Sequence, residues 1–105
     1  MYIYSRDNLF IFVIFRGDSG IEYMSIIKSD DPMKALERFS RENVFREVRY
    51  VLIDENIKID QGSLREFLER NKINLIERDK FKKLNELMSR EVLDKIISFI
   101  QKQNM

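Results

Sequence analysis

The sequence predicts a single α/β domain over residues 1–105, with a mixed sheet of four or five strands and three or four helices. Three observations support this prediction. The chain has 105 residues, which is a usual length for one domain. Several short apolar runs are bounded by turn residues, as strands are. Other segments have apolar residues three and four positions apart, as amphipathic helices have.

An N-terminal β-hairpin is the first predicted unit. After a short strand over residues 2–5, residues 8–15 (NLFIFVIF) are apolar on both faces, which indicates a buried central strand. The segment RGDSG then makes a turn, and residues 21–28 (IEYMSIIK) return as the second strand of the hairpin. The aromatic residues of this region are expected in the core rather than stacked on nucleic-acid bases: Tyr2, Tyr4, Phe10, Phe12 and Phe15.

Helix and strand signals alternate in the middle of the chain. A helix over residues 32–42 is predicted by the segment SDDP, because Asp is a favoured N-cap and Pro suits the first helical position. A second buried strand is predicted over residues 48–53 (VRYVLI). Ser63 and Glu66 then fit a capping box. The helix that they begin should end near Asn71, a residue suited to a left-handed C-cap.

A last strand over residues 73–76 (INLI) completes a strand–helix–strand unit, which should be parallel and right-handed. Beyond it, Asp79 is predicted to cap a final helical region. That region has an apolar face wider than one core contact needs, and an exposed part of such a face marks an interface. Core packing and association through this face both stay open. Its residues are Val92, Leu93, Ile96, Ile97, Phe99 and Ile100.

Composition limits the chemistry of any site. The chain has no Cys and no His, which excludes disulfides, thiolate metal sites and Ser-His or Cys-His nucleophile systems. We expect no cofactor, and carboxylate-bound Mg²⁺ is the one metal site left open. Nineteen basic and eighteen acidic residues give a net charge of +1, so no general attraction to nucleic acid or membrane is expected.

No apolar stretch reaches the roughly 18 residues of a membrane span, and no signal peptide is evident. A cytoplasmic location without membrane contact is therefore expected. Charged residues make up 35% of the chain, and Cys, His and Trp are absent. This composition resembles that of proteins from heat-loving archaea or their viruses.

Four acidic residues follow the two predicted parallel strands at their carboxyl ends: Asp54, Glu55, Glu77 and Asp79. Ligands of open α/β sheets bind at that edge, so these carboxylates are a candidate site for Mg²⁺ against a phosphate. The favoured alternative is that Asp79 caps a helix and the others are solvated loop charges.

The order of elements over residues 8–88 resembles the core of the restriction-endonuclease-like fold, particularly Mrr-type nucleases. The best match is VRYVLIDENIKIDQGSLREFLERNKINLIERDKFKKLNELM. Within it, INLIERDKFKKLNEL has the pattern of a strand followed by a helix that is typical of that family. The resemblance implies an Asp near the start of one hairpin strand. It also implies an acid or Gln, one spacer and a Lys on the next strand. These groups would bind Mg²⁺ and activate water.

On this resemblance, Asp7 and Lys28 are the candidate catalytic residues. If the hairpin turn centres on Asp18, the numbers of paired residues sum to about 36, which places Asp7 or its neighbour near Lys28. The position two before Lys28 is Ile26, which cannot bind a metal. Glu22 lies six residues from Lys28, roughly 20 Å along a strand, and cannot replace it. The resemblance therefore implies an incomplete Mg²⁺ site and no bound metal.

The leading functional hypothesis is a non-catalytic accessory or adaptor module in nucleic-acid metabolism. It would act through protein–protein contacts and form a homodimer through its C-terminal helix. One alternative is a divergent Mg²⁺-dependent nuclease that uses Asp7 and Lys28 with an acid from elsewhere, such as Asp30. Another is a viral or host regulatory protein that inhibits a larger enzyme. Nucleic acid as a partner stays open.

Overall fold

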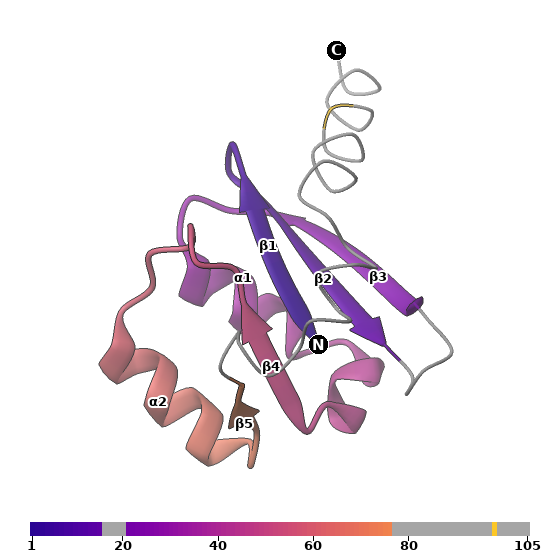
Figure 1. The fold of residues 1–105 in the computed structure, drawn as a ribbon, viewed down its shortest axis with the longest axis vertical. Coiled ribbons are helices and arrows are strands. Elements are labelled where there is room, and N and C mark those ends of the chain that lie inside the picture. The colour runs from indigo at the N-terminus through magenta and orange to yellow at the C-terminus, as the bar shows by residue number, and fades with distance from the viewer. Residues whose placement is uncertain (16–20, 77–97, 99–105) are drawn as a thin grey trace.

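The structure is a computed structural model that describes residues 1–15, 21–76 and 98. Its described elements form one mixed five-stranded sheet with helices packed on it (Figure 1). Their order is β1 (Tyr2–Arg6), β2 (Leu9–Phe15), β3 (Ile21–Lys28), α1 (Pro32–Phe39), the 3₁₀ helix η1 (Asn43–Glu47), β4 (Tyr50–Ile53), α2 (Gln61–Arg70) and β5 (Asn74–Leu75).

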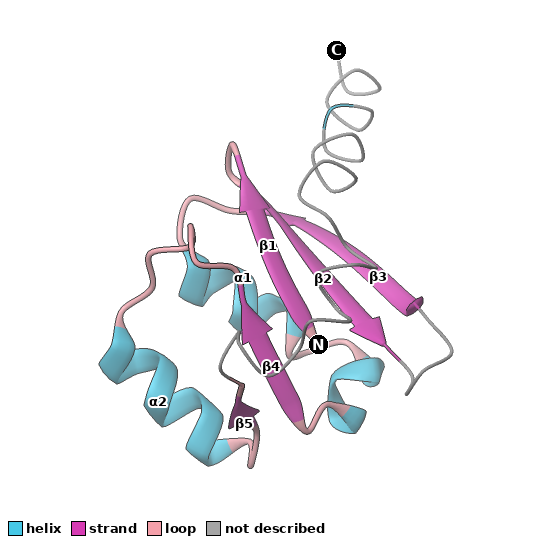
Figure 2. Ribbon diagram, viewed as in Figure 1, coloured by secondary structure: helices cyan, strands magenta, loops and turns pink. Residues whose placement is uncertain are grey.

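The α/β class and the five-stranded mixed sheet confirm the prediction, but the helix count does not. Within the described ranges there are two α-helices and one 3₁₀ helix (Figure 2), fewer than the three or four helices expected. The final helical region predicted from Asp79 lies outside the described residues except for Ser98, which is helical. No helix among the described residues is long and apolar enough to cross a bilayer.

The strand order across the sheet is β3-β2-β1-β4-β5. β1 and β2 are joined by a two-residue turn, Asp7 and Asn8, whose φ angles are 52° and 66°. Positive φ at both positions is the signature of a type I′ turn, which matches the twist of a hairpin, and Asp and Asn tolerate that conformation. The turn residue Asp7 is therefore explained by the backbone it must adopt.

The pairing of β2 with β3 follows the predicted register closely. Phe15 lies opposite Ile21, as expected, while Lys28 lies opposite Leu9 rather than Asn8. The difference of one residue arises because the register shifts between Ile14 and Phe15. A β-bulge of this kind adds one unpaired residue to one strand.

The parallel half of the sheet also matches the prediction. β4 pairs with β5 in parallel, with Tyr50 opposite Asn74, and β1 pairs in parallel with β4 on its other side. β1 is therefore a central strand. Tyr2 and Tyr4 are each only 5% exposed, which confirms the expectation that they belong to the core.

Apolar residues on both faces of the sheet are buried. On one face, α1, η1 and α2 supply residues to a single cluster that includes a chain of aromatic rings. Phe12 stacks on Phe39 at 4.5 Å between ring centroids, Phe39 meets Phe45 edge-on at 6.1 Å, and Phe45 lies 5.8 Å from Phe67. The opposite face forms a second cluster, to which neither described helix contributes: Tyr2, Tyr4, Leu9, Ile11, Val13 and Leu52.

The predicted helix caps are confirmed for α1 and corrected for α2. Asp31 caps α1, accepting the backbone N–H of Met33 at 3.2 Å, although the helix ends at Phe39 rather than residue 42. α2 begins after Asp60, whose carboxylate accepts the Ser63 backbone N–H at 2.9 Å and its hydroxyl at 2.7 Å. Ser63 is therefore a donor inside the first turn and not the N-cap, because an earlier carboxylate already satisfies that turn.

The end of α2 is also displaced from the prediction. Asn71 has a φ of −97°, which is not left-handed. The left-handed residue is its neighbour Lys72, with a φ of 56°. The side-chain amide of Asn71 instead donates to the carbonyl of Phe67 at 2.8 Å, which satisfies one of the carbonyls that a helix end leaves unpaired.

Candidate functional site

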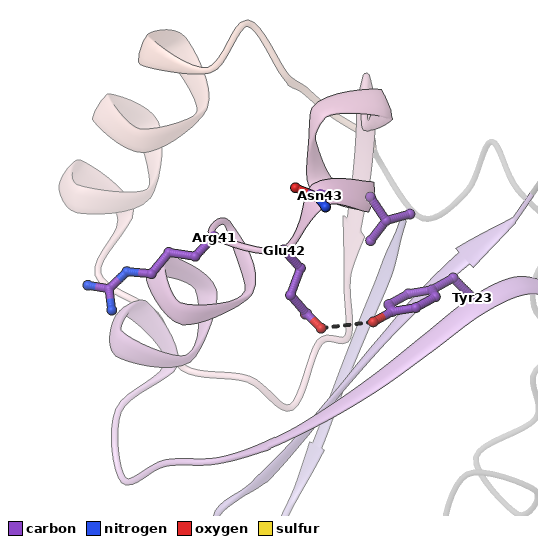
Figure 3. A pocket seen from close by; sticks show the side chains of 5 residues that line it. Tyr23, Arg41, Glu42 and Asn43 are labelled. Carbon is purple, nitrogen blue, oxygen red and sulfur yellow. Dashed lines mark hydrogen bonds between the residues drawn. The ribbon is translucent and has the colours of Figure 1, made fainter.

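A polar pocket lies between the edge strand β3 and the connection from α1 to η1. Its volume is 460 Å³, and it is lined by Tyr23, Arg41, Glu42, Asn43 and Val44. Figure 3 shows the side chains of Glu42 and Tyr23 directed toward each other across it, from two segments separated by 19 positions in the sequence.

Two hydroxyl groups of β3 hold the Glu42 carboxylate. The Tyr23 hydroxyl donates to Oε1 at 2.9 Å, and the Ser25 hydroxyl donates to the same oxygen at 3.3 Å. Tyr23 and Ser25 are two positions apart on one strand, so their side chains stand on the same face of the sheet. The geometry of the strand therefore determines where the carboxylate sits.

The bond to Glu42 also changes the acidity of Tyr23. The pKa of the Tyr23 phenol is raised above its ordinary value of 10.0, chiefly by the hydrogen bond to Glu42 and then by desolvation and the charge of the same carboxylate. Deprotonation would remove the donated hydrogen bond and put two negative groups side by side. The phenol consequently remains a hydrogen-bond donor at neutral pH.

The second oxygen of Glu42 has unused acceptor capacity. Oε2 is buried, and no donor among the described residues bonds to it. A buried acceptor without a partner costs roughly 1–3 kcal/mol, and more when the group is charged. Arg41 does not supply the missing donor, because its guanidinium points away from the Glu42–Tyr23 pair (Figure 3). The pocket thus has a negative group for which a donor-bearing cation is the complementary ligand.

The candidate pair Asp7 and Lys28 lies at one end of the antiparallel strands. Lys28 is opposite Leu9, and the backbone N–H of Ser29 donates to the carbonyl of Asn8 at 2.8 Å. The side chain of Asp7 is 63% exposed and lies 3.5 Å from Arg6. The register therefore brings the turn of Asp7 and the end of β3 together, as predicted.

Among the described residues, the metal ligands that would complete such a site are not found near this pair. Ile26 is opposite Ile11 and packs against the second hydrophobic cluster, so its side chain serves the core. Within the part of the chain that the structure describes, no three acidic side chains gather closely enough to bind a metal ion. Asp30, the acid considered as an additional ligand, is exposed just before α1.

The structure describes two of the four residues of the predicted acidic cluster, Asp54 and Glu55. Asp54 is 2% exposed, and its carboxylate accepts the Tyr2 hydroxyl at 2.9 Å and the backbone N–H of Asn56 at 3.1 Å. These bonds connect the end of β4 to the start of β1 and to the following loop. Glu55 is exposed, and Glu77 and Asp79 lie outside the described residues.

The predicted C-terminal interface also lies outside the described residues: Val92, Leu93, Ile96, Ile97, Phe99 and Ile100. The pocket at Glu42 was not predicted from the sequence. A strand with hydroxyl-bearing residues at alternate positions, Tyr23 and Ser25, is the one local signal that pointed to it.

No known protein family, curated protein or solved structure matches the chain.

Proposed function

We propose that this chain is a non-catalytic binding module whose pocket at Glu42 accepts a basic side chain, Lys or Arg, of a partner protein. The observation that supports the proposal is the Glu42 carboxylate itself. One of its oxygens accepts two hydroxyl groups, and the other is buried with no donor among the described residues. Glu42 is also one of the residues that line an open pocket.

A cationic ligand fits this arrangement better than a neutral or anionic one. Hydrogen bonds between an ammonium or guanidinium group and a carboxylate are about twice as strong as neutral ones. The Tyr23 ring and Val44 add apolar surface to the pocket, and the alkyl stem of Lys or Arg packs well on such surface. An anion would meet the negative charge of Glu42.

The test is a titration of isotope-labelled protein with N-acetylarginine amide and N-acetyllysine amide, followed by NMR. We expect shift changes concentrated at Tyr23, Ser25 and Glu42. Glu42→Gln should weaken binding by on the order of tenfold, because it removes the charge that assists the hydrogen bond. Glu47→Gln is the matched control, since Glu47 is an exposed acid of η1 outside the pocket lining. An equal response to N-acetylglutamine amide would contradict the proposal.

The wider setting is proposed from the sequence alone. A restriction-endonuclease-like core and an accessory role in nucleic-acid metabolism rest on the resemblance over residues 8–88, and an archaeal or viral thermophilic source rests on composition. A regulatory protein that inhibits a larger enzyme would use the same kind of protein contact. Co-purification from the native source followed by mass spectrometry separates an enzyme partner from an adaptor partner.

A divergent Mg²⁺-dependent nuclease is the second candidate, and the adjacency of the Asp7 turn to Lys28 favours it. Cleavage of single- and double-stranded substrates in Mg²⁺ or Mn²⁺ would be measured for the wild type, Asp7→Asn and Lys28→Ala. This candidate requires metal-dependent cleavage that both substitutions abolish. Absence of cleavage, or cleavage that Lys28→Ala leaves unchanged, would rule it out.

A further inference from the structure

We propose that the ligand of the Glu42 pocket carries a carboxylate beside its cation, and that Arg41 binds this carboxylate. The inference rests on the proposed function, because it takes Glu42 as the group that binds the cation. In a partner protein, such a ligand is a Lys or Arg that either ends the chain or stands next to an acidic residue. The supporting observation is an opposite charge on the same pocket, since Arg41 lines it together with Glu42.

Arg41 and Glu42 are neighbours in the sequence, yet they do not neutralise each other. Figure 3 shows the Arg41 guanidinium directed away from the Glu42 carboxylate, which instead faces Tyr23. Among the residues that the structure describes, Arg41 forms no ion pair. Its side chain is exposed, and exposed side chains change rotamer within nanoseconds. The guanidinium can therefore turn toward a ligand that enters the pocket.

The turn that carries both charges is held by the backbone at the end of α1. The N–H of Arg41 donates to the carbonyl of Arg38 at 3.2 Å, and the N–H of Glu42 donates to the carbonyl of Phe39 at 3.0 Å. Phe39 is fully buried in the core, so this turn is anchored to the rest of the fold. A ligand that contacts both charges consequently meets a backbone that is already ordered, which lowers the entropy lost on binding.

The different exposure of the two charges sets the direction of the ligand. One carboxylate oxygen of Glu42 is buried, whereas Arg41 is exposed. The ligand's cation therefore enters toward Glu42, and its carboxylate stays at the rim beside Arg41. The alkyl stem between them would lie along Val44 and the Tyr23 ring, which line the same pocket.

Together the two charges select against a ligand of one sign. A purely cationic ligand gains from Glu42 but approaches the like charge of Arg41, while a ligand with both charges is attracted to both. Arg binds a carboxylate through two parallel N–H···O bonds, which adds geometric specificity. Complementary charges of this kind contribute more to specificity than to raw affinity. We therefore expect a preference among basic ligands, of a size typical of an exposed ion pair.

The test is a titration of the full isotope-labelled chain, followed by NMR, with two pairs of probes that differ only in a carboxylate. N-acetylarginine against N-acetylarginine amide represents a residue that ends a chain. N-acetyl-Arg-Asp amide against N-acetyl-Arg-Asn amide represents a neighbouring acid. We expect the carboxylate member of at least one pair to bind about fivefold more tightly, near the upper limit for an exposed ion pair. It should also shift the Arg41 Nε–H signal, and the pair that responds identifies the source of the carboxylate.

Arg41→Gln should reduce this preference to about parity, because it removes the charge that attracts the carboxylate. Arg46→Gln is the matched control, since Arg46 is an exposed arginine of η1 that does not line the pocket, and the preference should persist in it. Circular dichroism confirms that each variant is folded.

The same titrations separate this inference from the proposed function. Equal binding of both members of each pair, or a preference that survives Arg41→Gln, would overturn the inference and leave Glu42 as the cation site. Binding of none of the probes, or binding that Glu42→Gln leaves unchanged, would contradict the proposed function and this inference with it.

Discussion

The Tyr2 hydroxyl donates to Oδ1 of Asp54 across 2.9 Å, joining two strands whose residues are 52 positions apart. Tyr2 lies in the parallel pairing of β1 with β4, opposite Leu52, and Asp54 directly follows the last residue of β4. Asp54 is 2% exposed, so its carboxylate depends on donors from the protein. The bond therefore stabilises the junction between the antiparallel and parallel halves of the sheet.

Tyr2→Phe should lower the free energy of unfolding by about 1–3 kcal/mol, because it leaves a buried carboxylate with one donor fewer. The measurement is equilibrium unfolding in urea. Tyr50→Phe is the matched control, since Tyr50 is 57% exposed, and it should change the stability little. Equal stability of the Tyr2 variant and the wild type would show that this bond does not hold the junction.

Asp31→Ala should lower the free energy of unfolding by about 1 kcal/mol, because it removes the acceptor that caps the first turn of α1. The neighbouring Asp30 is exposed and is not the N-cap, so Asp30→Ala serves as the control. Thermal unfolding of the two variants gives the comparison. A larger loss for Asp30 than for Asp31 would mean that the cap has been assigned to the wrong residue.

These capping residues show what local sequence could predict. Asp31 before Pro32 was recognisable because both preferences belong to single positions of a helix start. The true cap of α2 was missed because Ser63 fits a capping box equally well by type. Only the backbone reveals that Asp60 already occupies the cap and bonds to Ser63. Choosing between two adequate caps requires the tertiary path of the chain.

Apolar pattern predicted the sheet better than it predicted the site. Residues 8–15 are apolar on both faces, and this alone indicated the central position of β2. The Glu42 pocket depends instead on the approach of a loop to the side chains of Tyr23 and Ser25. The alternate hydroxyl groups of Tyr23 and Ser25 are visible in the sequence, but their approach to Glu42 is not, because these residues belong to elements that meet only after folding.

Glu42→Gln should lower the pKa of Tyr23 toward 10.0, because the hydrogen bond to the carboxylate is the largest cause of its raised value. A tyrosine whose pKa is raised by folding stabilises the folded protein at pH values below the pKa that the tyrosine has in the unfolded chain. That contribution is lost as the pH rises through the folded value. NMR of the Tyr23 ring carbon against pH measures the shift directly. An unchanged titration in the variant would contradict the assigned cause.

Phe39→Ala should lower the free energy of unfolding by about 3–5 kcal/mol, the usual loss for a large aromatic residue removed from a core. Phe39 is fully buried, stacks on Phe12 and meets Phe45 edge-on, so its ring joins the sheet to α1 and η1 together. Phe15→Ala is the control, since Phe15 is only partly buried at the end of β2, and its loss should be smaller. The two variants would be compared by urea unfolding, with far-ultraviolet circular dichroism to confirm that each folds. If Phe15→Ala proved the more damaging, the aromatic chain on the helix-covered face would not be the principal contact between sheet and helices.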